Sequence, residues 1–447
     1  MNNDTNQRRR QLLAGAGLLG AGVAMGATAL AAAPAKAGYA FPRGFLWGAA
    51  VAGHQVEGGN INSDGWLLEN VQPTVFAERS GDAVDHYRLF VQDIVLVASL
   101  GLNTFRFSIE WSRVEPEEGM FSTAALEHYR EVLEACHRHN VKPMVSFNHF
   151  TVPRWFAARG GWENDDAPAL FGRYCDKVAR HLGHLMAYAT TFNEPNLATM
   201  LFGTPGPLQA YSGTQREKDM LARAGQLSGT GKFSSWLFGD QEKMRAGYIA
   251  AHKAAYDAIH SAHPKLPVGF TIAIADDQAV GDSAMRDRKR AISYEPWFAL
   301  ASTHADFLGL QCYTRSRVTP EGELPPEAGV PLTDIGYEFY PQALEAALRY
   351  AATKVKLPLY VTENGIATGD DAKRVDYIRT AVQGVANCLT DGIDVRGYIH
   401  WSLLDNFEWN FGYAPRFGIV AVDRATQRRT PKPSARLLGS LAKANRI

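Results

Sequence analysis

Eight short runs of apolar, β-branched or aromatic residues recur along most of the 447-residue chain, and longer amphipathic segments separate them. This alternation predicts repeated βα units and therefore a parallel sheet. The stretch before Thr362 reads Pro-Leu-Tyr-Val, and such a continuous apolar run is typical of a strand covered on both faces. Segments 123–139 and 245–263 show helical periodicity. The expected strands are 45–52, 104–108, 142–147, 186–192, 267–274, 306–313, 358–362 and 395–402.

Eight βα units in the roughly 410 residues that follow position 37 fit the α/β class as a single (β/α)8 TIM barrel. Barrels of this kind reach this length as one domain, and the chain shows neither an inter-domain linker nor a short repeat. Long insertions, 203–236 and 319–333, follow the fourth and sixth expected strands. Because loops that follow barrel strands lie on the catalytic face, we expect both insertions to shape that face.

The first 37 residues differ from the rest of the chain. Arg8, Arg9 and Arg10 precede a Gly/Ala-rich apolar run, and Ala35-Lys36-Ala37 forms an A-x-A cleavage pattern. This predicts a twin-arginine-type signal peptide (1–37), the twin-arginine export machinery as a partner, and a periplasmic or extracellular catalytic domain (38–447) of a bacterium. A retained membrane anchor is the alternative, since about 20 residues can span a bilayer. Gly and Ala bury little apolar area, which disfavours the anchor. No stable membrane insertion is expected once the signal peptide has been removed.

Charge and cysteine usage exclude several classes of partner. The 46 basic and 46 acidic residues balance, which gives no reason to expect a nucleic acid or an electrostatic hold on a membrane. The four cysteines are widely spaced and form no CxxC pair, so we expect buried free thiols rather than a disulfide framework or zinc site: Cys136, Cys175, Cys312 and Cys388.

No metal or organic cofactor is expected. His252, His260 and His263 lie on one expected helix, but their spacing is not the i, i+4 pattern of a helical zinc pair. No phosphate-binding loop or dinucleotide fingerprint occurs in the sequence.

Glu57 and Glu110 are expected to be structural ion-pair or hydrogen-bonding groups.

Two glutamates stand where the fourth and seventh expected strands end. Glu194 lies in Thr-Phe-Asn-Glu-Pro and Glu363 in Val-Thr-Glu-Asn-Gly. A barrel brings the ends of its strands to one face, although these residues are about 170 positions apart. Two facing carboxylates can divide the cleavage of a glycosidic bond into acid-assisted departure and nucleophilic attack.

Both motifs resemble those of glycoside hydrolase family 1, the β-glucosidase and β-galactosidase family, in which TFNEP holds the acid/base and TENG the nucleophile. The resemblance runs from Phe-Leu-Trp-Gly-Ala-Ala at 45–50 to Arg-Phe-Gly at 416–418. It implies a retaining, exo-acting β-glycosidase with Glu194 as general acid/base and Glu363 as covalent nucleophile. A β-glucosidase is the first expectation, with β-galactosidase and β-fucosidase activity as additions.

The resemblance also implies roles for other residues. Arg106 and Tyr313 match the residues that donate hydrogen bonds to the nucleophile, and Asn193 matches the asparagine that binds the sugar 2-hydroxyl. The remaining matches are expected to bind substrate: Gln55 and His149 to sugar hydroxyls, Trp401 as the sugar platform, Glu408 and Trp409 to the far hydroxyls, and Tyr337 to the aglycone.

Some positions depart from the family pattern. Gln311 stands for a common asparagine, Tyr337 for the aglycone tryptophan, and Phe150 for the tryptophan frequently found after the histidine. Members that act on 6-phosphorylated sugars replace the equivalent of Glu408 with a small neutral residue and tend to have tyrosine where this chain has Phe417. These departures leave catalysis expected, a phospho-sugar substrate disfavoured and the aglycone open.

Three alternatives stay open at this point. A transglycosylase would use the same covalent intermediate with a sugar or alcohol acceptor in place of water. A non-catalytic glycan-binding protein could use the same scaffold, although such proteins typically lose one of the two glutamates. An endo-acting barrel glycosidase would differ in loop shape, which the sequence does not show.

Overall fold

Eight parallel strands close into a barrel in the computed structural model, which describes residues 38–447. Their order is β1-β11-β10-β7-β5-β4-β3-β2, and β1 pairs with both β2 and β11. All eight expected strands are present, which confirms the single (β/α)8 barrel. Their bounds are β1 Leu46–Ala50, β2 Thr104–Ser108, β3 Lys142–Asn148, β4 Tyr188–Asn193, β5 Val268–Ala273, β7 Phe307–Gln311, β10 Leu359–Glu363 and β11 Val395–Trp401.

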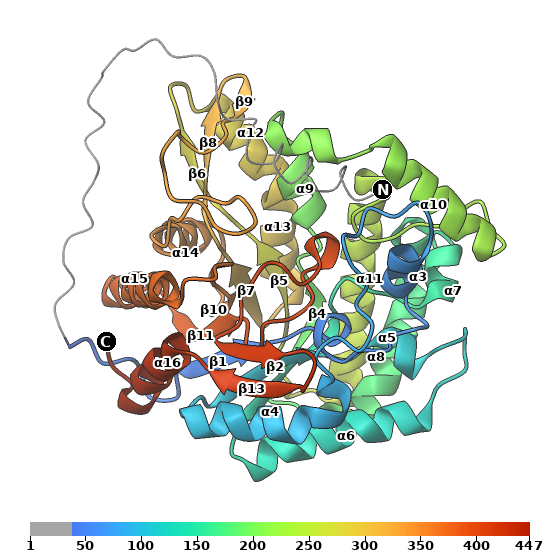
Figure 1. Ribbon diagram of the computed structural model, residues 1–447, viewed down its shortest axis with the longest axis horizontal. Helices are drawn as coiled ribbons and strands as arrows, with labels where there is room; N and C mark the ends of the chain where they lie inside the picture. Colours follow the sequence, from blue (N-terminus) through green and yellow to red (C-terminus); the bar gives the residue numbers. More distant parts are fainter. Residues whose placement is uncertain (1–37) are drawn as a thin grey trace.

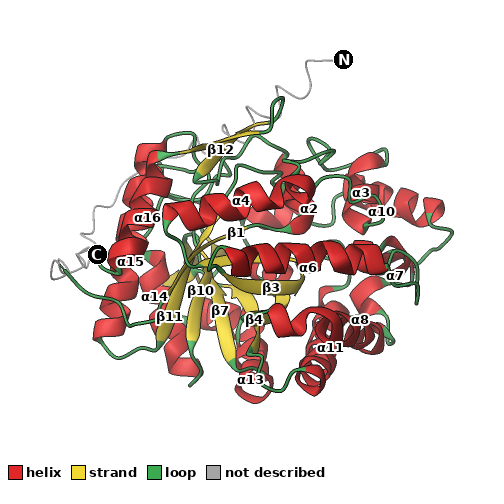
Figure 2. Ribbon diagram, turned by 90° about the horizontal axis from the view of Figure 1, so that it is seen from below, coloured by secondary structure: helices red, strands yellow, loops and turns green. Residues whose placement is uncertain are grey.

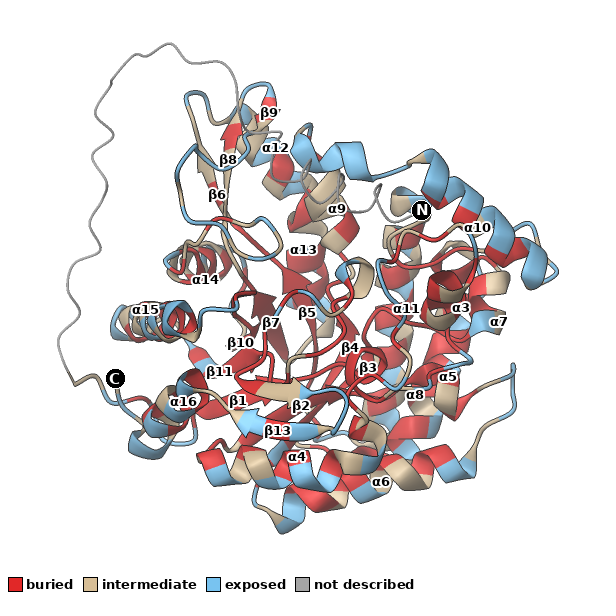
Figure 3. Cartoon of the chain, viewed as in Figure 1, coloured by how far each residue is buried: buried red, intermediate tan, exposed pale blue. Residues whose placement is uncertain are grey.

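A ring of helices surrounds these strands (Figure 1), and Figure 2 shows the helices flanking the strands from outside. The ring contains α4 His86–Leu100, α6 Thr123–Arg138, α8 Ala167–Leu182, α11 Gln241–Ala262, α13 Glu295–His304, α14 Ala343–Lys354, α15 Asp371–Thr390 and α16 Pro433–Ala444. Each turns its apolar stripe toward the barrel and its exposed residues toward the outside, so buried and exposed residues occupy opposite faces of one helix (Figure 3). In α6, for example, Leu126, Tyr129 and Leu133 are buried at helical spacing.

Shorter elements occupy the connections. The helices among them are α2 Gly53–Val56, α3 Asp64–Asn70, α5 Trp111–Val114, α7 Arg154–Ala158, α9 Leu197–Phe202, α10 Gln215–Leu227 and α12 Ala284–Ser293, with 3-10 turns η1 Gly161–Glu163, η2 Gly183–Leu185, η3 Pro207–Tyr211 and η4 Trp409–Phe411. A three-stranded sheet lies beyond the barrel (Figure 1): β6 Asp276–Ala279, β8 Arg315–Thr319 and β9 Gly322–Glu323. A hairpin of β12 Val420–Asp423 and β13 Arg428–Pro431 precedes α16.

The two long insertions are more ordered than their composition suggests. Within 203–236, Thr214 and Glu217 form a reciprocal capping box that starts α10. The insertion after the sixth barrel strand begins at the end of β8, and β9 pairs back onto β8. Both insertions follow the carboxyl ends of barrel strands, so they lie on the catalytic face as expected.

Several other expectations can be compared with residues 38–447. All four cysteines are buried and unbridged, which confirms the free thiols. His252 contacts the Thr191 hydroxyl at 2.7 Å and His260 contacts Asp306 at 3.1 Å, so these histidines pack within the helical layer. No helix in this part of the chain combines the length and apolar character needed to cross a bilayer. The proposed signal peptide, 1–37, lies outside the described residues.

The first and last described residues are hydrogen-bonded to each other. The Gly38 amide donates to the Ile447 carbonyl at 3.0 Å, and the Ile447 amide donates to the Tyr39 carbonyl at 3.1 Å. Asn445 reinforces this contact, because its side chain donates to the Phe41 carbonyl at 2.7 Å. The segment that leads into β1 is therefore held against the end of α16.

Candidate functional site

The two motif glutamates lie where the strand pairing is irregular. Glu194 directly follows β4, and the β4–β5 register shifts between Thr190 and Asn193. Glu363 ends β10, and the β10–β7 register shifts between Val361 and Glu363. Such irregularities bend a strand locally and re-aim the side chain that follows. Glu194 also has a left-handed backbone, with φ of 44°, a strained conformation that clusters at functional sites.

Both carboxylate oxygens of Glu363 accept hydrogen bonds. Arg106, in β2, donates to Oε1 at 2.5 Å, and the Tyr313 hydroxyl donates to Oε2 at 2.6 Å. Burial raises the pKa of Glu363, whereas the Arg106 charge and the hydrogen bond from Tyr313 oppose that rise. The structure therefore brings three of the expected catalytic residues into one contact and fixes the orientation of this carboxylate.

Asn193 sits beside this group and is held by its side-chain oxygen. Its Oδ1 accepts from Arg106 at 2.6 Å, from Gln311 at 2.9 Å and from Thr271 at 3.3 Å. Thr271 also donates to Gln311 Oε1 at 2.9 Å, which fixes the Gln311 amide. Among residues 38–447, the Asn193 Nδ2 group has no hydrogen-bond partner. Gln311 and Thr271 thus orient Asn193 with its amide donor available, a role that the sequence did not predict.

Glu194 experiences a different environment from Glu363. Its side chain is 8% exposed and lies close enough to Glu363 for the two charges to interact. Burial, and then the negative charge of Glu363, raise the pKa of Glu194 well above the ordinary carboxyl value, while Arg106 opposes this. Tyr337, which is half-buried, lies close enough to Glu194 to feel its charge. Burial and then that charge raise the pKa of Tyr337 to about 12.

Gln55 and Glu408 meet on the other side of the site. Gln55 Nε2, in α2, donates to the Phe407 carbonyl at 2.8 Å, to Asn406 Oδ1 at 3.1 Å and to Glu408 Oε2 at 3.2 Å. The remaining oxygens, Gln55 Oε1 and Glu408 Oε1, have no protein partner within the described chain. Burial and the Glu363 charge raise the pKa of Glu408 to about 8. Gln55 and Glu408 are thus hydrogen-bonded to each other, and each keeps one buried oxygen that can still accept a hydrogen bond.

An aromatic cluster lines the same region; we use this name for His149, Phe150, Trp236, Trp401 and Trp409. The His149 ring stacks on Trp401 at 5.6 Å and on Trp409 at 6.3 Å, measured between ring centroids. Burial and the Arg106 charge lower the pKa of His149 well below its usual value, so the imidazole is neutral. Its Nδ1 has no hydrogen-bond partner in residues 38–447. The expected residues His149, Trp401 and Trp409 are therefore together.

Trp236 is a member of this cluster that the sequence did not predict. Its ring stacks on Phe150, with centroids 4.2 Å apart and planes 15° apart, and tilts against Trp409 at 5.4 Å. A tryptophan in a Gly/Ser-rich insertion, together with a phenylalanine where relatives often have tryptophan, was the available signal.

Glu57 and Glu110 have the structural roles expected of them. Glu57 pairs with Arg113 at 2.7 Å, and Glu110 accepts hydrogen bonds from Asn60 and Thr151, each at 2.7 Å. These contacts join the loops that follow β1, β2 and β3. They support the site without adding a reactive group to it.

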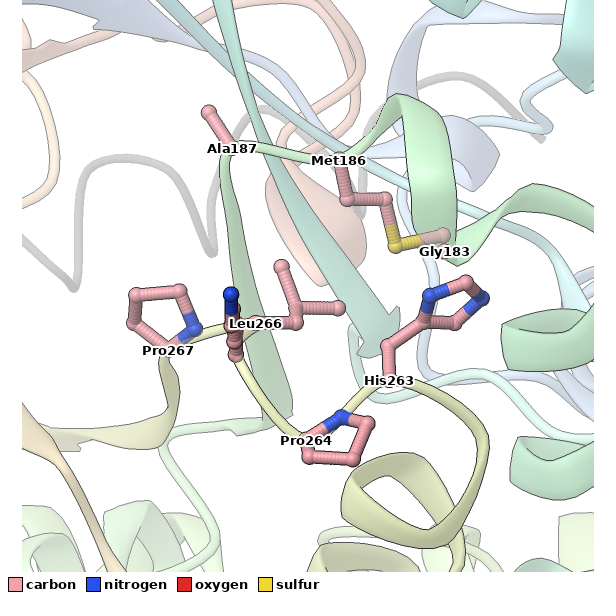
Figure 4. Close-up of a pocket in the computed structure, with 8 residues that line it drawn as sticks. Gly183, Met186, Ala187, His263, Pro264, Leu266 and Pro267 are labelled. Carbon is pink, nitrogen blue, oxygen red and sulfur yellow. The ribbon is translucent and has the colours of Figure 1, made fainter.

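A cavity of about 430 Å³ lies elsewhere (Figure 4). Gly183, Met186 and Ala187, which precede β4, line one side, and the segment 263–267, which precedes β5, lines the other. It is therefore at the amino ends of the strands, opposite the glutamates. Within residues 38–447 no cluster of three histidine, cysteine or acidic side chains could hold a metal ion.

Comparison with known proteins identifies the relatives of this arrangement. The family model described as glycosyl hydrolase family 1 matches residues 38–220 and 300–447. A β-glucosidase from Agrobacterium sp. is 30% identical over 463 residues, which cover 90% of this chain and 95% of that protein. The apo structure of a beta-glucosidase 1317 is 49% identical, with a TM-score of 0.86, and covers 90% of this chain and 98% of its own. A crystal structure of beta-glycosidase BGL167 is 50% identical, with a TM-score of 0.85, and covers 90% and 97%.

The family match spans both glutamate motifs, and the similar structures cover the barrel almost completely. The chain therefore belongs to glycosyl hydrolase family 1, and it is a glycoside hydrolase built on a (β/α)8 barrel.

Proposed function

We propose that this protein is a retaining, exo-acting β-glycosidase that prefers β-glucosides and also accepts β-galactosides or β-fucosides. One observation carries the proposal. Two buried carboxylates interact. Arg106 and Tyr313 hold both oxygens of Glu363, while burial and then the Glu363 charge raise the pKa of Glu194. This asymmetry suits a nucleophile and an acid. The β-glucosidase names of the relatives support the choice of sugar.

The first step forms a covalent glycosyl-enzyme. The Glu363 carboxylate attacks the anomeric carbon, and the bond from that carbon to the aglycone oxygen breaks. Glu194 transfers its proton to the departing oxygen, so the aglycone leaves as a neutral alcohol. Burial and the Glu363 charge raise the pKa of Glu194, so its carboxyl keeps that proton to a higher pH than an ordinary glutamate would.

The second step returns the enzyme to its starting state. Once Glu363 is esterified its negative charge is gone, which removes one cause of the raised pKa of Glu194. Glu194 then accepts a proton from water, the water oxygen bonds to the anomeric carbon, and the ester bond to Glu363 breaks. Two displacements on one carbon give net retention. An acceptor alcohol in place of water would give transglycosylation.

The groups without protein partners fit sugar recognition. Gln55 Oε1, Glu408 Oε1, His149 Nδ1 and Asn193 Nδ2 are buried and have no hydrogen-bond partner in the described part of the chain. A buried polar group costs about 1–3 kcal/mol when unpaired, so hydroxyl groups that pair with these atoms contribute to binding. We assign Gln55 and His149 to sugar hydroxyls, Glu408 and Trp409 to the far hydroxyls and Asn193 to the 2-hydroxyl, with Trp401 as the platform for the ring.

We also propose that residues 1–37 direct export through the twin-arginine machinery. The consecutive arginines and the A-x-A pattern support this. The four buried free thiols are compatible with folding in a reducing compartment before export. Replacement of Arg8, Arg9 and Arg10 by lysine, followed by fractionation, tests it: retention of the full-length chain in the cytoplasm supports the proposal, and unchanged export contradicts it.

The proposed reaction is tested with initial rates on p-nitrophenyl β- and α-glycosides, using protein that begins at Gly38. Release from β-glucoside, β-galactoside or β-fucoside, with none from the α-anomers or from the 6-phospho-β-glucoside, is the expected result. Proton NMR of the first product should show the β-anomer. Release of the α-anomer first contradicts retention, and no turnover by folded protein supports a non-catalytic glycan-binding protein instead.

Substitution of Glu408 by glutamine is expected to weaken β-glucoside binding. The amide keeps the size of the side chain but replaces an oxygen with an NH2 group, so a sugar hydroxyl that donates to Glu408 loses its acceptor, and a buried polar group left unpaired costs about 1–3 kcal/mol. KM for p-nitrophenyl β-glucoside should rise about 10- to 100-fold. The 6-deoxy substrate p-nitrophenyl β-fucoside should lose less, because it lacks one far hydroxyl. Equal losses on both sugars would contradict the assignment of Glu408.

Substitution of Tyr337 by alanine is expected to affect the aglycone. The Tyr337 amide and carbonyl are hydrogen-bonded to Thr333, at 3.0 and 2.8 Å, and Arg315 holds the adjacent Glu338 at 2.9 and 2.7 Å. The backbone therefore keeps its place when the ring is removed. KM should rise about 3- to 10-fold for an aryl β-glucoside, as expected for one aromatic contact, and stay nearly unchanged for methyl β-glucoside. Tyr337→Phe, which keeps the ring, is the control; a loss that is equal on both substrates contradicts the role.

A further inference from the structure

Phe150 and Trp236 together occupy one side of the aromatic cluster. Phe150 directly follows His149. Trp236 comes from the insertion after β4, and only 6% of its surface is exposed. The two rings are in parallel contact, with centroids 4.2 Å apart. A ring from a distant part of the chain therefore fills the space beside the smaller Phe150.

Specific hydrogen bonds hold the backbone around Trp236 against the barrel. The Ser234 amide donates to the Ala157 carbonyl at 3.0 Å, and the Ser235 hydroxyl donates to Asp64 Oδ2 at 2.6 Å. Asp64 Oδ1 also accepts from the Val152 amide at 2.9 Å. Through these two hydrogen bonds, the fully buried Asp64 joins the segment that carries Trp236 to the segment that carries Phe150.

Trp236 reaches the expected sugar-binding residues through Trp409. Its ring lies 5.4 Å from the Trp409 ring at 58°, and the edge of Phe150 meets Trp409 at 5.4 Å and 72°. Trp409 follows Glu408, whose position Gln55 fixes from the other side. A change in the position of Trp409 therefore changes the position of the residues that we assign to the far hydroxyls.

Of the rings in this contact, only Trp236 lies in the part of the chain that the family model leaves unmatched. The match stops at residue 220 and resumes at residue 300, so Phe150, His149 and Trp409 lie inside it and Trp236 lies outside.

We propose that Trp236 is a positioning residue for Trp409 and Glu408, and that through them it determines which glycone the enzyme prefers. The inference rests on the proposed function, since it concerns the same sugar-binding site. Trp236 adds, from a distant insertion, a second ring stacked on Phe150. It acts on recognition of the far hydroxyls and has no part in the transfer of the proton or in nucleophilic attack.

The test compares Trp236→Leu with Trp236→Phe on p-nitrophenyl β-glucoside and β-xyloside, since the xyloside lacks the hydroxymethyl group. For Trp236→Leu, KM for the glucoside should rise about tenfold, and kcat should fall less than about threefold, because one aromatic contact is lost far from the reacting atoms. The ratio of kcat/KM for glucoside over xyloside should fall at least about threefold. Trp236→Phe should recover most of that ratio.

Trp297→Leu provides a matched control. Trp297 is also buried, but it lies in α13 and packs on Phe270 at 6.1 Å, outside the aromatic cluster. Its truncation should lower thermal stability and leave the glucoside-to-xyloside ratio unchanged. The double variant Phe150→Trp/Trp236→Leu moves the larger ring to position 150, which also contacts Trp409, and it should restore the ratio that Trp236→Leu loses.

Binding without turnover separates this inference from the proposed function. Calorimetric titration with deoxynojirimycin and with its xylose-configured analogue should show that Trp236→Leu weakens the first about tenfold and the second less. An inactive wild-type protein whose variant shows this shift retains the inference and loses the proposed reaction. An active wild type whose Trp236→Leu variant changes both sugars equally, or neither, overturns the inference and leaves the reaction standing.

Discussion

Glu363→Gly is expected to lower kcat on aryl β-glucosides by about 10⁵-fold or more, because it removes the group proposed to form the covalent intermediate. The same change leaves Arg106 and Tyr313 facing the space that the carboxylate occupied. Azide or formate should enter that space and attack the anomeric carbon of an activated substrate. Steady-state rates with and without azide measure the rescue.

The stereochemistry of the rescued product is the sharper measurement. Azide that replaces Glu363 performs one displacement, so the product should be the α-glycosyl azide. Glu363→Gln is the matched control, because the amide fills the space and should block rescue although it is equally inactive. A β-azide product, or rescue of the Gln variant as well as the Gly variant, would contradict the nucleophile assignment.

Glu194→Ala should have an effect that depends on the leaving group. An alkyl aglycone needs the proton, so kcat/KM for methyl β-glucoside should fall about 10²- to 10⁴-fold, the usual contribution of general acid catalysis. For 2,4-dinitrophenyl β-glucoside, whose leaving group departs without a proton, kcat/KM should change little. Azide should now accelerate release of the intermediate and give the β-glycosyl azide. Equal losses on both substrates would exclude Glu194 as the acid.

The pH profile follows from the same assignment. Glu363 must be ionised and Glu194 protonated for the first step, so kcat/KM should fall at low pH as Glu363 gains a proton and at high pH as Glu194 loses one. Because burial and the Glu363 charge raise the pKa of Glu194, the fall at high pH should come well above the ordinary carboxyl range. In Glu194→Ala this basic limb should be absent. A basic limb that persists both in this variant and in Glu194→Ala/Glu408→Gln, which also removes the Glu408 carboxyl whose pKa is raised to about 8, would identify another group as the acid.

The barrel was predictable because its signals are local. Each strand is a short apolar run, and both motif glutamates stand at the end of one, so the order along the chain already places Glu194 and Glu363 on one face. The strand register is different. The shifts before Asn193 and before Glu363 depend on pairing with β5 and β7, which no local pattern encodes.

The unpredicted parts share a dependence on contacts across the fold. β9 has only two residues, too few for any periodicity, and it is held by pairing with β8. The sequence shows Gln311 only as an amide in place of a common asparagine. That it orients Asn193 is visible only in its hydrogen bonds with Asn193 and Thr271. The helix α10 did carry a readable signal, since Thr214 followed three residues later by Glu217 is a capping-box pattern.

The hydrogen bonds between Gly38 and Ile447 have a consequence for engineering the chain. Because these residues are in direct contact, a linker of a few residues would join them and close the described chain into a ring. New termini could then be opened at Gly392, an exposed turn with positive φ between α15 and β11, at the amino end of a strand and away from the glutamates. Such a circular permutant would keep every strand neighbour of the barrel. Fusion partners attached at this turn would then lie on the side of the barrel opposite the glutamates.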